Sequence, residues 1–180
     1  MDNQDQIIIP APVKDVAPIK DVNPSSSRYT KITGASCDCN TIKLLKALLG
    51  GRYGEFTGHS TYFYQSLISQ ALNSALASSL RGLSDAERNH MDLIGNAIIA
   101  FGGNPRFTNG QGTPWSSRMI DYTTDKNAFL TNNIRREERA IREYEKTITK
   151  VTNESLRQLF REIIADKRNH ILILQGLLNR

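Results

Sequence analysis

Three stretches of this chain repeat apolar residues at alternating steps of four and three, and ionisable side chains interrupt each stripe. Residues with this spacing lie on one face of an α-helix. The interruptions are Glu87, His90, Glu137, Lys167 and His170. The stripes are Leu76, Leu80, Leu83, Glu87, His90, Ile94, Ala97 and Phe101; Leu130, Ile134, Glu137, Ile141, Tyr144, Ile148 and Val151; and Leu156, Phe160, Ile163, Lys167, His170, Leu174 and Leu177. The pattern predicts helices packed around a core with a polar centre.

A fourth, earlier stretch has the same spacing and a more polar face. It carries Glu55, His59, Tyr62, Ser66 and Ser69. Together the four stretches predict an all-α fold, a four-helix bundle that extends from about residue 53 to residue 178.

Sequence signals for helix ends separate the stretches. The segment from Phe101 through Gly102 to Pro105 is a glycine stop followed by proline, and Thr124 with Asp125 can cap the third helix. The connection between them, about twenty residues, is much longer than the usual loop in a bundle. We therefore expect one long crossover between helices two and three, which lets these two helices run parallel.

The segment 84–87, Ser-Asp-Ala-Glu, can also be interpreted as a capping box that starts a new helix. A helix that began at Ser84 would leave Leu76, Leu80 and Leu83 outside their own stripe, so we favour one continuous helix. Gly82 then lies inside that helix at a cost of about 1 kcal/mol, where it could relieve crowding.

The first forty residues have a different composition. They contain four prolines and the repeated hexapeptide Ala-Pro-Val/Ile-Lys-Asp-Val at 11–16 and 17–22. Proline every six residues removes backbone donors and excludes a helix. The segment is either a disordered leash or an extended arm that docks on a neighbouring subunit. We divide the chain into this arm, residues 1–40, and a bundle domain, residues 41–180.

Charge and composition exclude several classes of function. The net charge is +5 and the pI about 9.3, but basic residues are scattered among acidic ones without a basic, aromatic-interleaved stripe, so we expect no nucleic-acid binding. No apolar run has the length of a signal peptide or a membrane span, so we expect a soluble, unexported protein with no membrane contact. We interpret Cys37 and Cys39, outside the bundle, as reduced surface thiols rather than a metal or redox pair.

The polar interruptions form an internal repeat. The two halves are Glu55, Tyr62 and Glu87-Arg88-Asn89-His90, and Glu137, Tyr144 and Lys167-Arg168-Asn169-His170. Residues equally far from a short turn lie level in an antiparallel pair, because both helices rise about 1.5 Å per residue. The midpoints fall near residues 71–73 and 152–154, both turn-forming sequences. The inward polar side chains are therefore expected at one height.

Such a cluster favours a bound cation. Buried carboxylates are destabilising unless they are paired or bind a metal. A glutamate followed three residues later by a histidine places an oxygen and a nitrogen ligand on one helical face, which suits iron, manganese or zinc. The duplication strengthens this interpretation.

On these motifs the chain resembles the ferritin-like superfamily, specifically rubrerythrin-type and manganese-catalase-type proteins, and within them small ferritin-like proteins of spore-forming anaerobes. The resemblance covers residues from about 53 to 178. It rests on Gly54-Glu55-Phe56-Thr57, Tyr62-Phe63-Tyr64-Gln65-Ser66, Glu87-Arg88-Asn89-His90, Gly102-Gly103-Asn104-Pro105-Arg106-Phe107, Trp115, Tyr122, Asn133-Ile134, Glu137, Tyr144 and Asp166-Lys167-Arg168-Asn169-His170.

The resemblance implies a set of metal ligands. Glu55, Glu87 and His90 match the ligands of one metal, and Glu137 and His170 match ligands of the other, with Glu87 at a bridging position. The implied cofactor is iron or manganese, and the implied chemistry concerns peroxide or dioxygen.

Lys167 departs from the family pattern, because it stands where the second Glu-x-x-His supplies its glutamate. A full site offers four carboxylates to two divalent ions, whereas here three carboxylates face one lysine, a deficit that one divalent ion would fill. Three states compete: one metal with Lys167 paired to Glu137 or Glu87; two metals with Lys167 neutral or turned away; and no metal, with the lysine as the cation.

Other residues are candidates for supporting roles. Tyr62 and Tyr144 can donate hydrogen bonds to carboxylates across the bundle. His59 could be a substitute ligand, although we favour a satisfied core histidine. Trp115 and Tyr122 are expected to pack the crossover against the bundle.

Two functions follow as hypotheses. The first is a ferritin-like metal-binding protein with a lysine-altered di-metal site, which handles iron, manganese or peroxide; if active, it would be an oxidoreductase of the rubrerythrin, manganese-catalase or ferroxidase type. The second is a structural or assembly protein that keeps the fold and uses residues 1–40 for subunit or partner contacts. In either case we expect a homo-oligomer, located in the cytoplasm or associated with spores.

Overall fold

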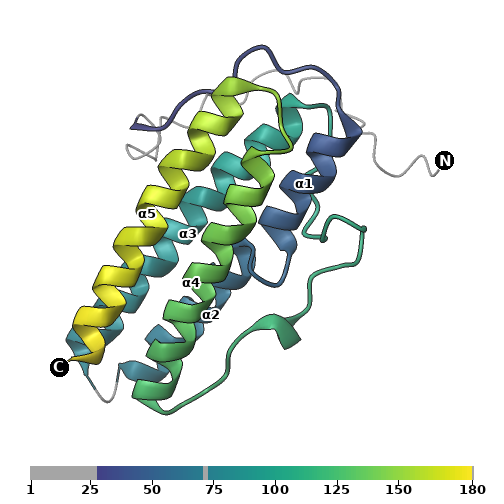
Figure 1. Cartoon of the computed structure of the whole chain (residues 1–180). Helices are drawn as coiled ribbons and strands as arrows, with labels where there is room; N and C mark the ends of the chain where they lie inside the picture. Colours follow the sequence, from purple (N-terminus) through teal and green to yellow (C-terminus); the bar gives the residue numbers. More distant parts are fainter. Residues whose placement is uncertain (1–27, 71–72, 180) are drawn as a thin grey trace, which may run out of the picture.

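The computed structural model describes residues 28–70 and 73–179, which contain five α-helices and no β-strand (Figure 1). The helices are α1 (Cys39–Gly50), α2 (Glu55–Ser69), α3 (Ser74–Ala100), α4 (Lys126–Ile148) and α5 (Glu154–Leu178), with a short 3-10 helix, η3 (Ser117–Met119), before α4. None of the described helices is both long and apolar enough to cross a membrane.

Helices α2 to α5 form the predicted four-helix bundle. The pairs α2/α3 and α4/α5 are antiparallel hairpins, and α3 and α4 run in the same direction (Figure 1). The connection from α3 to α4 passes along the outside of the bundle, as expected for one long crossover. The all-α, ferritin-like fold class is confirmed.

Side-chain caps define three of the helix starts. Asn73, Asp125 and Asn153 precede α3, α4 and α5, and each accepts a hydrogen bond from the backbone N–H three residues later, at 2.8 to 3.0 Å. Such caps satisfy donors that a helix start leaves unpaired. The expected cap at Asp125 is confirmed, and Gly102, at φ +83°, follows α3 as the expected glycine stop.

Helix α1 was not predicted, because helical periodicity was expected to begin only after Gly54. Asp38 caps it by accepting from the Asn40 N–H at 2.9 Å, and Leu45, Leu48 and Leu49 bury its inner face. Helix α1 packs against α2, α3 and α4, and it lies beside the upper part of α3 while α2 accompanies the lower part (Figure 1). Two short helices in succession therefore line the long α3.

Two hydrophobic clusters occupy the ends of the bundle. The upper cluster joins α1 to the end of α3 and the start of α5, with Leu45, Ile98 and Phe160 among its members. The lower cluster includes Leu80 and Leu130. The ionisable residues of the stripes lie between these clusters, where apolar packing above and below separates them from water.

The described part of the N-terminal segment lies on α5 of the same chain. Tyr29 is 8% exposed, and Thr30 donates from its N–H and its hydroxyl to Glu162 at 2.8 and 2.7 Å. Thr33 further contacts Ser155, whose hydroxyl accepts from the Thr33 N–H at 3.0 Å. The hexapeptide repeat, and with it the choice between a leash and a docking arm, lies outside the described residues.

Helix α3 is continuous through Ser84, so no second helix starts there. Gly82 is exposed, and a Cβ at this position would have no atom within 4 Å, so it relieves no crowding. Gly58, in α2, is the opposite case, since a Cβ there would lie 2.5 Å from Nη1 of Arg136.

We expect Gly82→Ala to raise the free energy of unfolding by about 0.5–1 kcal/mol, because alanine restricts the unfolded chain and meets no obstacle in the helix. Gly58→Ala is the matched comparison and should destabilise the protein through the clash with Arg136. Urea unfolding followed by circular dichroism measures both. A loss of stability in Gly82→Ala would contradict the continuous, uncrowded helix.

Candidate metal centre

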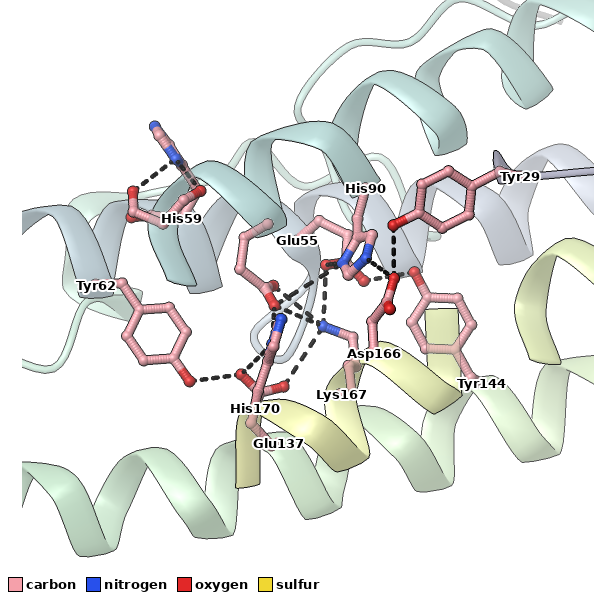
Figure 2. A network of polar contacts seen from close by, with 12 residues as sticks. Tyr29, Glu55, His59, Tyr62, His90, Glu137, Tyr144, Asp166, Lys167 and His170 are labelled. Atoms are coloured by element: carbon pink, nitrogen blue, oxygen red, sulfur yellow. Dashed lines mark hydrogen bonds and ion pairs between the residues drawn. The ribbon is translucent and has the colours of Figure 1, made fainter. Parts of the chain in front are cut away.

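The predicted ligand residues come together in one buried layer (Figure 2). Glu55 is the first residue of α2, Glu87 and His90 lie one turn apart in α3, Glu137 lies in α4 and His170 in α5. The three glutamates and His90 are 0% exposed and His170 is 4% exposed. The register of the stripes therefore placed these side chains at the same height, as the repeat predicted.

The Lys167 ammonium lies among the three glutamates. Its Nζ is 3.0 Å from Oε2 of Glu55, 3.1 Å from both carboxylate oxygens of Glu87 and 3.5 Å from Oε2 of Glu137 (Figure 2). Lys167 is itself fully buried. The lysine thus supplies a positive charge to all three carboxylates.

The donor atoms fall into two sets of three, each with its atoms within 4.8 Å of one another. One set is Glu55, Glu87 and His90; the other is Glu87, Glu137 and His170. Glu87 belongs to both, which is the geometry expected of a bridging ligand.

Three atoms of these sets are buried without a hydrogen-bond partner among the described residues. They are Nδ1 of His90, Nδ1 of His170 and Oε2 of Glu137. The His170 nitrogen lies 3.2 Å from Oε1 of Glu87, but this pair lacks hydrogen-bond alignment. Unpaired buried polar atoms are costly, and all three are of the kinds that bind iron or manganese, so the residues fit a metal.

Two tyrosines hold the outer oxygens of the cluster. The Tyr62 hydroxyl donates to Oε1 of Glu137 at 2.6 Å, and the Tyr144 hydroxyl donates to Oε1 of Glu55 at 2.5 Å (Figure 2). Each tyrosine is almost fully buried. These bonds fix the carboxylates and leave their other oxygens directed toward Lys167.

Asp166 is a supporting residue that the sequence analysis missed. Its Oδ2 lies 3.1 Å from Nε2 of His90 and accepts a hydrogen bond from the Tyr29 hydroxyl at 2.5 Å. A carboxylate at Nε2 leaves Nδ1 as the free nitrogen of His90 and fixes the ring orientation. The sequence places Asp166 directly before Lys167, next to the inward face of its helix. It does not show that Asp166 contacts His90 on another helix.

Arg136 is the second missed residue. It is 9% exposed, its Nη2 donates to Oε1 of Glu137 at 2.8 Å, and its guanidinium lies over the Tyr62 ring, 4.7 Å from the ring centroid. Only a glycine at position 58 leaves room for this side chain beside Glu87. The sequence shows Arg136 next to Glu137 but not its burial.

Burial and mutual charge set the protonation of the centre. Burial alone would raise the pKa of Glu137, but Lys167 and Arg136 outweigh it and lower the pKa to about 2. At Glu87 burial would also raise the pKa, but the nearby Lys167 ammonium outweighs burial and holds the Glu87 pKa well below its usual value. Burial would lower the pKa of His170, yet the carboxylates of Glu137 and Glu87, 3.6 and 3.2 Å from its Nδ1, raise it to about 9. Glu55 differs from the other two glutamates, because burial and the neighbouring Glu87 charge raise its pKa.

The remaining candidates lie outside the cluster. Nδ1 of His59 is 3.0 Å from the Ser84 backbone oxygen, and Figure 2 places this histidine apart from the carboxylates. The Trp115 indole N–H donates to the Thr57 hydroxyl at 2.9 Å, which packs the crossover on α2 as expected. Tyr122 makes an edge contact with the Tyr64 ring at 4.9 Å between centroids.

The cysteines also lie apart from the centre. Cys37 and Cys39 are free and exposed. This state agrees with their interpretation as surface thiols.

Comparison with known proteins supports the family that the motifs indicate. A probable manganese catalase from Clostridium acetobutylicum is 23% identical over 158 residues, covering 76% of this chain and 69% of the relative. The structure of KatB, a manganese catalase from Anabaena, superposes with a TM-score of 0.77 at 20% identity, over 83% of this chain and 75% of KatB. A Rhodobacter capsulatus bacterioferritin with a metal-free dinuclear site gives a TM-score of 0.66 at 22% identity, over 80% of this chain and 86% of the bacterioferritin. At these identities the solved structures establish a shared fold.

The family model for rubrerythrin matches residues 46–178, which include α2 to α5 and every candidate ligand. This chain belongs to the rubrerythrin family.

Proposed function

We propose that this chain binds iron or manganese at the buried centre, with Glu55, Glu87, His90, Glu137 and His170 as ligands. The observation that carries the proposal is the set of three ligand atoms buried without a hydrogen-bond partner, one on each histidine and one on Glu137. His90 belongs to one donor set, and His170 and Glu137 belong to the other. A divalent ion in either set would satisfy the atoms of that set, including the Glu137 oxygen that lies 3.5 Å from Lys167.

The charge of the centre favours one ion at a time. When ionised, Glu55, Glu87 and Glu137 carry three negative charges; Lys167 compensates one of them at 3.0 to 3.5 Å, and Arg136, which donates to Glu137 at 2.8 Å, compensates a second. With neutral histidines one negative charge remains, so one divalent ion leaves the centre at a net charge of +1 and two ions would leave it at +3. A second ion would bring two more charges close to the ammonium, so it requires Lys167 to lose its proton or turn away.

When bound, the metal supplies a redox-active Lewis acid, and we infer that the substrate is peroxide, by analogy with relatives named as manganese catalases. The chain's own residues have positioning roles. Tyr62 and Tyr144 hold Glu137 and Glu55 in place, and Asp166 orients His90.

The decisive comparison is between wild type and Lys167→Glu. We expect wild type purified from manganese- or iron-supplemented medium to hold about one ion per chain, and Lys167→Glu to hold about two with a higher rate of peroxide consumption. Elemental analysis and oxygen evolution measure these quantities.

His59→Gln is the matched control, since this histidine bonds to Ser84 outside the cluster and should leave metal content unchanged. His170→Gln should reduce metal content. Wild-type protein with far less than one ion of any metal would contradict the proposal.

A second function, a structural or assembly protein without metal chemistry, is favoured by one specific observation. Lys167 already lies within ion-pairing distance of all three glutamates. In that state Lys167 holds the bundle together in place of a metal.

Lys167→Met tests this role. Removing the ammonium leaves three buried carboxylates without their counter-charge, so we expect metal-free protein to lose about 3–5 kcal/mol of stability. Manganese should restore part of that loss if the cluster binds metal, and none of it if the centre is purely structural. Lys150→Met, at an exposed turn position, is the control for loss of a lysine. Denaturant unfolding with and without metal measures the difference, and an unchanged stability would contradict the role of Lys167.

We further propose that the chain forms a homo-oligomer and that residues 1–40 contribute to subunit or partner contacts. Leu172 and Ile173 in α5 remain 65% and 38% exposed, which supports association through this helix. A location in the cytoplasm or the spore stays a prediction from the sequence.

Deletion of residues 1–27 tests whether this part of the N-terminal segment contributes to the subunit contacts of the proposed oligomer. The deletion keeps the segment from Arg28 to Thr33 that lies on α5, so the bundle should keep its helical circular dichroism. We expect the number of chains per oligomer, measured by light scattering, to fall. An unchanged number would exclude a role of residues 1–27 in assembly.

A further inference from the structure

A pocket of about 330 Å³ lies on the outside of the bundle, next to the buried centre. The turn between α1 and α2, the crossover around η3 and one face of α4 form its walls. Its lining includes Tyr53, Asp121, Arg52, Arg118, Arg135, Arg136 and Arg139.

Five of these residues are arginines, and Asp121 is the only acidic one. Both oxygens of Asp121 accept hydrogen bonds from uncharged groups: Oδ1 from Thr123, and Oδ2 from the Asn132 amide at 3.0 Å. Asp121 therefore makes no ion pair with these arginines among the described residues, and the pocket keeps an excess of positive charge.

Some arginines on the described surface outside this pocket form ion pairs. Arg157 and Arg161 both pair with Glu154, at 3.1 and 2.9 Å. By contrast, Arg118 and Arg135 make no ion pair with any described residue. Like charges held close together repel, and this repulsion is relieved when an anion binds between them.

Part of the pocket is already fixed in position. Nη1 of Arg139 donates to the Tyr53 hydroxyl at 2.9 Å, and its guanidinium lies 5.4 Å from the centroid of the Tyr53 ring. Tyr53 donates to no other described residue, so its proton is available to a ligand. A preorganised donor loses less entropy when it binds.

Arg136 connects the pocket to the centre. It lines the pocket, while its Nη2 donates to Glu137 at 2.8 Å. Its Nε and Nη1 are buried and have no hydrogen-bond partner among the described residues. One buried guanidinium thus belongs both to the pocket and to the polar cluster.

We propose that this pocket binds a small oxyanion with at least two negative charges, of the phosphate class. Guanidinium groups match tetrahedral and carboxylate oxyanions through paired N–H donors. The volume is at the small end of ligand pockets, which suits a small ion and excludes a large cofactor. The arginines of the pocket would bind the anion whether or not the buried centre binds a metal.

Isothermal titration of metal-free protein with inorganic phosphate, at neutral pH and constant ionic strength, tests this proposal. We expect saturable binding of one phosphate per chain, with sulfate and citrate competing and chloride not competing. Arg118→Gln and Arg135→Gln should each weaken binding about tenfold, because each removes one charge-assisted donor. The double variant should abolish measurable binding.

Arg142→Gln is the matched control, because it removes the same charge from the exposed face of α4 outside the pocket. It should leave the affinity within about twofold. Equal weakening by Arg142→Gln would show that only the net charge matters and would overturn the proposal. The absence of saturable binding to a wild-type protein with normal circular dichroism would overturn it as well.

Discussion

The Lys167 ammonium is the contact on which the structure of the centre depends. Three glutamates from three different helices lie within 3.5 Å of it, and all four side chains are removed from water. Buried carboxylates at this separation repel one another, so they can remain charged only because a cation lies between them. Because Lys167 belongs to α5, these contacts connect α5 to α2, α3 and α4 at one level of the bundle.

The arrangement around this layer follows from the need to keep it dry and aligned. Hydrophobic clusters close the bundle above and below, and Tyr62 and Tyr144 satisfy the outer oxygens of the carboxylates. Gly58 leaves room beside α2 for the Arg136 guanidinium, which donates to Glu137. Arg136 in turn borders the arginine-lined pocket, so the surface charge and the buried charge are parts of one network.

Helix α1 and Asp166 show where sequence reasoning was incomplete. The apolar spacing of Leu45, Leu48 and Leu49 is a helical signal, but the proline-containing segment before it and the glycines after it obscured the element. Asp166 lies one residue from the inward stripe, and no periodic pattern marks it as a partner of His90. Local patterns identify the face of a helix more reliably than residues at the edge of that face.

The sequence by itself determined the four bundle helices, the long crossover and the level at which Glu55, Glu87, His90, Glu137, Lys167 and His170 meet. Helical periodicity and turn position fix these features, because they depend only on distances along each helix. Only the tertiary structure decided that Lys167 contacts all three glutamates at once, and that five arginines from three segments surround one pocket. Those contacts depend on how separate helices rotate and approach one another, which spacing along a single chain does not specify.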